Sequence, residues 1–429
     1  MFPYFFSPSC VIGRSLTFQM LNFPHSKLTI FSNVHRHKMS NKRLNGIQFL
    51  RGFAVLAVVL GHNRGTMYDN IVAGSFIDYI TSNAIFGVEV FFVISGFIIS
   101  HSTQSIKFSS FAESLSFLIK RFFRIYPLYL MVLALYVSLY YYNYYTGEFS
   151  LGHLSIENII QSVFISSYQS DVISPIYGWG TLVVAWTLRY EIYFYIIFAI
   201  SMIFTAKYRS VLTTAIIITI FIFSSYYYQG HLVLDAQSFP IPNTTPDKYI
   251  GFAGNPIVLD FILGMIIAES EKLFGDNRFY NNKNTGYFYI VIINICLILW
   301  FTSAFGGNGI TRSGIIAFFL VFSVVRIERI FSPSFPKIIT IIGESSYSLY
   351  LIHIPVKEFA DYYGNYFSFI PKQGTLALFF ASISLSITLS VLIFNLIEKP
   401  INRFGHRLAN KILPPRNLKK PQPLSVGAF

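Results

Sequence analysis

The sequence predicts an all-α protein that crosses a membrane about ten times and has both termini in the cytoplasm. Three observations predict this class. Of the 429 residues, 53% are hydrophobic and only 12% are charged, whereas an ordinary soluble domain has about 25% charged residues. Long apolar segments recur along the chain, and lysine and arginine concentrate in alternate loops between them. We therefore expect a multi-pass protein of the cell inner (plasma) membrane.

Ten apolar segments account for the predicted spans. They lie at residues 47–62, 84–101, 125–142, 182–205, 210–228, 256–269, 287–304, 312–325, 339–354 and 375–396. Several are shorter than the ~20 residues of an ideal transmembrane helix, including the sixth. An even number of spans places both termini on the same side.

The distribution of positive charge predicts which side that is. From Met39 onward, 21 lysine and arginine residues lie in the termini and the even-numbered loops. The odd-numbered loops hold only five, namely Arg64, Lys248, Arg312, Lys357 and Lys372. Cytoplasmic loops carry the excess of lysine and arginine, so the first set is predicted to be cytoplasmic. The long loop 143–180 contains neither residue type and is predicted to be external.

Composition divides the chain into three regions. Residues 1–44 form an N-terminal extension, and we expect translation to start at Met39. Residues 45–400 form the membrane domain, and residues 401–429 form a basic cytoplasmic tail suited to anionic lipid headgroups. The net charge of +13 comes without a nucleic-acid-binding motif, and the two cysteines and scattered histidines show no metal-ligand spacing. We therefore expect the lipid bilayer as a partner, but neither nucleic acid nor a metal.

The first apolar segment carries two candidate functional residues. Arg51 and His62 are eleven residues apart, which on a helix is about three turns and ~16 Å along one face. If Arg51 marks the inner edge of a hydrocarbon layer ~30 Å thick, His62 lies near its middle. An ionisable side chain at that depth indicates a functional site. The alternative is that His62 merely ends the helix at the outer interface, because Asn63 and Arg64 follow it.

Six motifs follow one another along the chain. They are LRGFAVLAVVLGH (50–62), FGVEVFFVISGFIIS (86–100), KRFFRIYPLYL (120–130), WTLRYEIYFY (186–195), GESSYSLYLIH (343–353) and EKP (398–400). In this order they resemble the membrane acyltransferase 3 family, whose members transfer acyl groups to extracytoplasmic sugars. The opening GIQFLRG is similar to members that acetylate exopolysaccharide. Two residues depart from the family pattern: Glu89 stands where aspartate is common, and Arg189 stands where a small or polar residue is usual.

The resemblance implies roles for four residues. His62 would be the catalytic base, Arg51 a cation on the donor side, and Arg121 with Arg124 a contact for the phosphates of the donor. The donor would be acetyl-CoA (or another acyl-CoA) from the cytoplasm, which is a substrate, so no bound cofactor is expected.

The residue types support this chemistry. Acyl transfer to a hydroxyl needs a base within ~3 Å of the attacking oxygen, and the unperturbed pKa of histidine lies near working pH. A carboxylate can hold the tautomer of such a histidine. Glu191 is the candidate, because it lies ~13 Å along its helix from Leu182, near the depth of His62. The alternative for Glu191 is a structural ion pair, although Arg189, two positions away, points to the opposite side.

Two further groups have both a functional and a structural interpretation. Arg121 and Arg124 lie three residues apart in the predicted cytoplasmic loop before the third helix, where they could bind a pyrophosphate or simply be positive-inside charge. Ser346, Tyr350 and His353 form a polar stripe at positions i, i+4 and i+7. Tyr350 and His353 are candidates for the acceptor path, and the alternative is hydrogen bonding between helices.

The sequence thus predicts an integral membrane O-acyltransferase that moves an acetyl group from cytoplasmic acetyl-CoA to a hydroxyl of an exported or cell-surface polysaccharide. Direct transfer and a transient acyl-histidine both fit, and another acyl group or a lipid-linked sugar acceptor are alternatives. A different class of function is a transporter or flippase of glycan precursors, in which His62 and Glu191 relay protons.

Overall fold

The computed structural model describes residues 44–83, 85–145, 155–166, 174–239, 245–275, 277, 280–363 and 367–413. Every regular element in these ranges is a helix, which confirms the predicted all-α class. The expected start at Met39, the N-terminal extension up to residue 43 and most of the basic tail lie outside the described residues.

Each of the ten predicted segments overlaps a long helix. These helices are α2 (Asn45–Asn63), α4 (Ile85–Thr103), α5 (Phe111–Tyr145), α7 (Ala185–Phe204), α8 (Arg209–Gln229), α10 (Leu259–Phe274), α11 (Lys283–Phe301), α12 (Ile315–Phe331), α14 (Ser346–Tyr363) and α15 (Leu376–Ile393). Shorter elements join them. These are η1 (Arg64–Asn70), α3 (Phe76–Ser82), α6 (Ile156–Val163), α9 (Thr245–Ala253), η3 (Pro256–Val258), η4 (Ile310–Gly314), α13 (Lys337–Glu344), η5 (Phe394–Glu398) and α16 (Lys399–Ile412).

Eight helical stretches in the described part of the chain are long and apolar enough to cross a membrane. The stretches that contain α12 and α14 are not among them. Helix α12 has 17 residues, and α14 carries Lys357, Glu358 and Asp361 in its second half. Ten spans and the side on which the termini lie therefore stay predictions.

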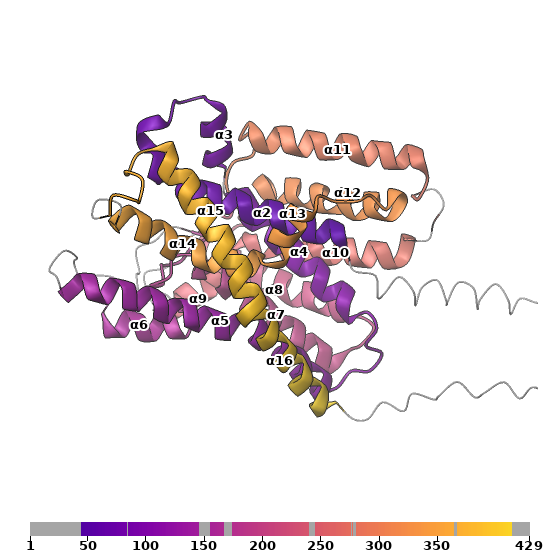
Figure 1. The fold of residues 1–429 in the computed structure, drawn as a ribbon. Coiled ribbons are helices and arrows are strands. Elements are labelled where there is room, and N and C mark those ends of the chain that lie inside the picture. The colour runs from indigo at the N-terminus through magenta and orange to yellow at the C-terminus, as the bar shows by residue number, and fades with distance from the viewer. Residues whose placement is uncertain are drawn as a thin grey trace, which may run out of the picture. The chain divides into compact units, whose positions relative to one another are not determined.

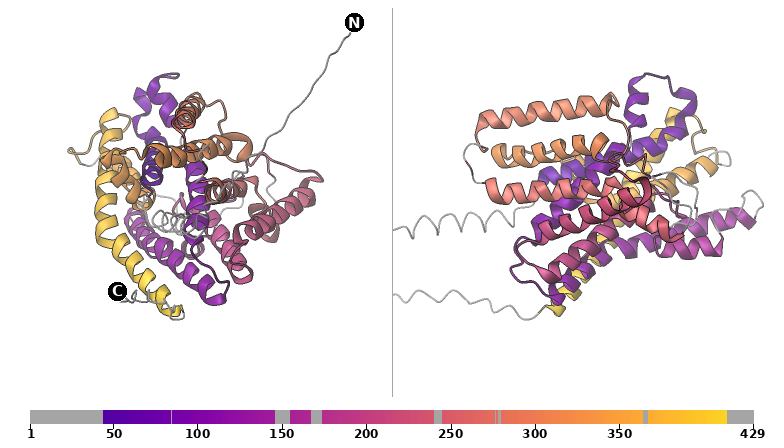
Figure 2. Two further views of the ribbon diagram at one scale, coloured as in Figure 1. Left: turned by 90° about the vertical axis from the view of Figure 1, so that its right-hand side faces the viewer. Right: turned by 180° about the vertical axis from the view of Figure 1, so that it is seen from behind.

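Helix α4 is central to the packing. It contacts α2, α7, α10 and α12 (Figure 1), and 72% of its apolar stretch is buried. The corresponding value for α11 is 17%, and α11 packs mainly on α12 at the edge of the bundle (Figure 2). Both helices are rich in apolar residues, so the difference in burial shows that α4 packs against protein, whereas most of α11 has a surface suited to lipid.

The structure corrects the predicted boundaries of two segments. Helix α5 begins at Phe111, fourteen residues before the predicted segment, so Arg121 and Arg124 lie within a helix and not in a loop. A search for apolar runs misses this part because polar residues interrupt it. The predicted segment 339–354 is divided at Ser345 into α13 and α14.

Two glycines set the distance between α13 and the first membrane helix. A Cβ atom on Gly343 would lie 1.8 Å from the carbonyl oxygen of Gln48, and one on Gly52 would lie 2.2 Å from that of Ile339. Only glycine allows the two backbones to approach this closely. The contact holds the start of α14 beside the middle of α2, where Arg51 lies.

Candidate active site

A cavity of about 290 Å³ lies between α2, α4, α5, α7 and α14. Helix α4 supplies an apolar wall, which includes Val88, Phe91 and Phe92. The ionisable groups of the lining other than tyrosines are three arginines, one glutamate and one histidine: Arg51, Arg121, Arg124, Glu191 and His406. The cavity therefore combines an apolar wall with an excess of positive charge.

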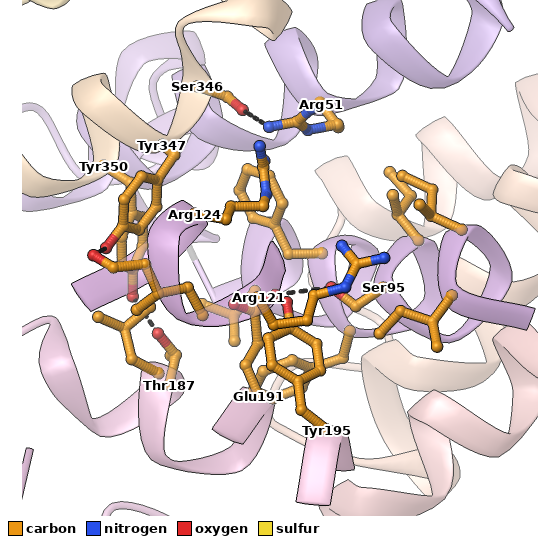
Figure 3. A pocket seen from close by; sticks show the side chains of 18 of the residues that line it. Arg51, Ser95, Arg121, Arg124, Thr187, Glu191, Tyr195, Ser346, Tyr347 and Tyr350 are labelled. Carbon is orange, nitrogen blue, oxygen red and sulfur yellow. Dashed lines mark hydrogen bonds between the residues drawn. The ribbon is translucent and has the colours of Figure 1, made fainter. Parts of the chain in front are cut away.

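Arg51 enters the cavity from α2 and is 9% exposed. Its guanidinium group donates hydrogen bonds to Oγ of Ser346 at 2.7 Å and to Oε1 of Gln48 at 3.2 Å (Figure 3). Both acceptors are uncharged. Ser346 is the first residue of α14, so the break between α13 and α14 places this hydroxyl against Arg51.

Arg121 and Arg124 reach the same cavity from α5, as predicted for a pair that shares one face (Figure 3). The guanidinium carbon of Arg121 lies 5.1 Å from the ring centre of Phe117 and 5.5 Å from that of Tyr195. Nη1 of Arg124 lies 3.8 Å from Oε1 of Glu398. The structure thus brings all three predicted donor-side arginines together, and within the described ranges Arg124 is the one of the three with a carboxylate at ion-pair distance.

Glu191 lines the cavity from α7. Its carboxylate accepts a hydrogen bond of 2.7 Å from Oγ of Ser95 on α4 (Figure 3). No hydrogen bond joins Glu191 to His62 among the described residues. Glu191 is therefore grouped with the arginines, and the proton relay that a His62–Glu191 transporter would need is not supported.

His62 is not among the residues that line the cavity, and it is paired with another histidine. Its Nδ1 is 2.8 Å from Nε2 of His353 on α14, and the two rings are stacked with their centres 5.1 Å apart. The ring of Tyr350, which lines the cavity, lies 6.0 Å from the ring of His353. Tyr350 thus connects the histidine pair to the cavity.

All three residues of the predicted polar stripe bond to neighbouring helices. Ser346 accepts from Arg51 on α2, His353 bonds to His62 on α2, and the hydroxyl of Tyr350 lies 2.7 Å from Oγ1 of Thr187 on α7. The structural alternative for the stripe, hydrogen bonding between helices, is confirmed. An acceptor path along Tyr350 and His353 stays a prediction.

Comparison with known proteins identifies the chain. The profile of the acyltransferase domain of the acyltransferase 3 family matches residues 44–395. The chain belongs to the acyltransferase 3 family. The protein is therefore an acyltransferase, and its several apolar helices indicate a multi-pass membrane protein. No solved structure gives a significant match.

Two curated proteins are similar to this acyltransferase 3 protein in sequence. The exopolysaccharide production protein ExoZ of Rhizobium meliloti (strain 1021) is 24% identical over 333 residues, which cover 74% of this chain and 90% of ExoZ. A protein of Staphylococcus aureus (strain COL), provisionally named as an O-acetyltransferase, is 25% identical over 390 residues. That match covers 85% of this chain and 58% of the staphylococcal protein. The chain thus spans little more than half the length of the second relative.

The two residues that depart from the family pattern have different partners in the structure. Arg189 donates to the backbone carbonyl oxygens of Ile176 (2.7 Å) and Tyr177 (3.2 Å), so it fastens the loop before α7 and does not pair with Glu191. Glu89 is fully buried and accepts a hydrogen bond of 2.8 Å from Asn308.

Sequence reasoning missed several residues of the site. Ser95 of α4 is the hydrogen-bond partner of Glu191. Glu398 is 2% exposed and accepts a hydrogen bond of 2.6 Å from Ser348. Gln48 could have been found, because it precedes Arg51 by three positions on the same helix face. The described residues contain no group of three or more His, Cys, Asp or Glu side chains that could hold a metal ion.

Proposed function

We propose that this acyltransferase 3 protein transfers an acetyl group from acetyl-CoA in the cytoplasm to a hydroxyl of an exported or cell-surface polysaccharide. In this proposal the protein lies in the cell inner (plasma) membrane, and His62 is the base. The observation that carries the proposal is the convergence of Arg51, Arg121 and Arg124 on one cavity that contains a single carboxylate, Glu191.

Such a cavity suits an anionic donor with an apolar portion. Arginine binds phosphate oxygens through charge-assisted hydrogen bonds, often two at once. A volume of about 290 Å³ is at the small end of ligand sites, which range over ~300–1,000 Å³. The cavity would therefore hold the phosphate and pantetheine part of the donor, with the nucleoside outside. His406 and Tyr195 would border this part of the donor.

The proposed chemical step uses His62 as the base. The acceptor hydroxyl gives its proton to Nε2 of His62 as its oxygen attacks the thioester carbonyl carbon. The carbon–sulfur bond then breaks, and the leaving thiolate takes the proton back from His62. Glu191 offsets part of the arginine charge, and the acceptor would approach past Tyr350 and His353. The name of the ExoZ relative supports an exopolysaccharide acceptor, and the name of the staphylococcal relative supports O-acetyl transfer.

The test is nuclear magnetic resonance of the surface polysaccharide from a deletion strain that carries wild-type protein, His62→Ala or His101→Ala. His101 is the matched control, because it is a partly buried histidine on α4 stacked on Phe97, outside the cavity. We expect loss of O-acetyl signals with His62→Ala alone, at an unchanged yield of exported polysaccharide. Unchanged O-acetyl signals with His62→Ala would refute the assignment of the base. Acetylated polysaccharide retained inside the cells would indicate transport.

A further inference from the structure

Two histidines that are 291 positions apart in the sequence face each other beside the cavity. His62 lies in the last turn of α2, and His353 lies on α14 and is fully buried. We propose that His353 is a positioning residue, which fixes the tautomer and the orientation of His62. The inference rests on the function proposed above, in which His62 is the base.

The backbone carbonyl group of Leu349 determines where the protons lie. Nδ1 of His353 is 3.1 Å from this oxygen, and a carbonyl oxygen can only accept a hydrogen bond, so Nδ1 carries a hydrogen. In a neutral imidazole the other nitrogen is then an acceptor. Nε2 of His353 therefore accepts, and Nδ1 of His62, at 2.8 Å, must donate. This assignment is inferred from the hydrogen-bond partners.

The consequence is that Nε2 of His62 carries no hydrogen. A histidine can act as a base only through a nitrogen with a free lone pair, so the pair selects the productive tautomer. The opposite arrangement would require a doubly protonated His353. That would place a positive charge at a fully buried position, which is costly without a carboxylate partner.

His353 also stabilises the charge that appears during the reaction. When Nε2 of His62 takes the proton of the acceptor hydroxyl, the ring becomes an imidazolium, and its Nδ1–H bond to His353 becomes charge-assisted. In the Ser-His-Asp arrangement a carboxylate has this role. A neutral imidazole can do the same without burying a permanent negative charge. No proton is transferred to or from His353 in this step.

The side chains one turn before and one turn after His353 on α14 bond to other residues. Tyr350, one turn earlier on α14, directs its hydroxyl group to Thr187 and to the carbonyl oxygen of Val184 at 3.0 Å. Lys357, one turn later, forms an ion pair of 3.0 Å with Asp361. The polar ends of both side chains therefore bond elsewhere, and His62 is the side-chain partner of His353.

Two substitutions that differ by one methylene group test the proposal. In His353→Gln the amide oxygen can reach the position of Nε2 and accept from His62, whereas in His353→Asn the shorter side chain reaches only the position of Nδ1. We expect His353→Asn to lower kcat by about 10²–10⁴-fold, the usual contribution of a positioned acid or base. His353→Gln should recover at least tenfold of that loss. The KM for acetyl-CoA should stay within about twofold of the wild-type value in both.

The assay measures thiol release from acetyl-CoA by the purified full-length protein in lipid vesicles, with alkali-deacetylated polysaccharide of the producing strain as acceptor. His101→Asn is the control for a histidine outside the site, and thermal denaturation shows whether each variant is folded. Equal kcat values for folded His353→Gln and His353→Asn would overturn the positioning role. Wild-type activity in His62→Ala would instead overturn the proposed function, so the two failures can be told apart.

Discussion

Two groups of partly or fully buried arginines in this protein have different partners. On α12, Arg326 and Arg329 both bond to Glu271 of α10, at 2.6 and 3.1 Å. In the cavity, Arg51 bonds to uncharged groups, and the nearest carboxylate of Arg124 lies at 3.8 Å. In the first group one carboxylate bonds directly to both arginines, whereas the second group directs its positive charge into the cavity. The number of charged residues does not distinguish the two groups, but their hydrogen-bond and ion-pair partners do.

The largest expected effect comes from removing the carboxylate that Arg326 and Arg329 share. Replacing Glu271 by alanine leaves Arg326, which is 2% exposed, without its carboxylate. Removal of one partner of a buried ion pair costs about 3–5 kcal/mol. We expect a clear fall in the midpoint of thermal denaturation, with no change in the KM for acetyl-CoA. A raised KM at unchanged stability would show that this group also serves the donor.

Replacement of a cavity arginine should change the KM for acetyl-CoA and leave stability nearly unchanged. In Arg121→Gln, loss of a charge-assisted hydrogen bond to the donor, worth about 1.5–3 kcal/mol, should raise the KM for acetyl-CoA about 10–100-fold. The midpoint of thermal denaturation should change little, because no carboxylate is left unpaired. Arg329→Gln is the matched control and should alter stability but not KM. Equal KM values for Arg121→Gln and wild type would remove Arg121 from the donor site.

A smaller effect sharpens the role of Glu191. As the one carboxylate that lines the cavity, it repels an anionic donor. In Glu191→Gln we expect the affinity for CoA to rise about three- to tenfold, which corresponds to a Coulomb energy of about 1 kcal/mol. Isothermal titration calorimetry measures this affinity. A fall in kcat with unchanged affinity would instead favour the role that the sequence predicted, in which Glu191 acts in catalysis.

The smallest effect concerns one more arginine, which belongs to neither group and lies outside the membrane-spanning helices. Arg312 donates to both carboxylate oxygens of Asp235, at 2.9 and 3.0 Å, and these bonds hold the pKa of Asp235 below its ordinary value of 3.8. The ion pair therefore stabilises the fold above that pH and loses its contribution as the pH falls below it. Because both side chains are partly exposed, Asp235→Asn should cost at most about 1 kcal/mol near neutral pH. Denaturation of wild type and Asp235→Asn at a series of pH values checks this. A difference in the free energy of unfolding that stays constant down to low pH would contradict the prediction.

Helical periodicity predicted what lies within one helix. Arg51 and His62 on α2, and Arg121 and Arg124 on α5, share faces because residues three, four or eleven positions apart lie on one side of a helix. Hydropathy located all ten long helices for the same reason, since each apolar run is local. The start of α5 was missed because its first turns are amphipathic, and such turns do not form an apolar run.

Contacts between helices could not be read from the sequence. The pairing of His62 with His353, and of Glu191 with Ser95, depends on how α2, α4, α7 and α14 are packed. Depth along a helix placed Glu191 and His62 at similar levels, but it does not give the direction in which each helix faces. Glu398 follows an apolar run in the sequence, and only the fold shows that it is buried beside Arg124 of α5 and Ser348 of α14.

The close backbone contact at Gly52 and Gly343 predicts where some loss-of-function mutations will occur. Neither residue has a side chain that could touch donor or acceptor, yet any replacement would push α13 away from α2 and withdraw Ser346 from Arg51. Strains selected for altered surface polysaccharide should therefore carry some of their lesions at these two codons. Such alleles would look unrelated to the chemistry until the two helices are viewed together.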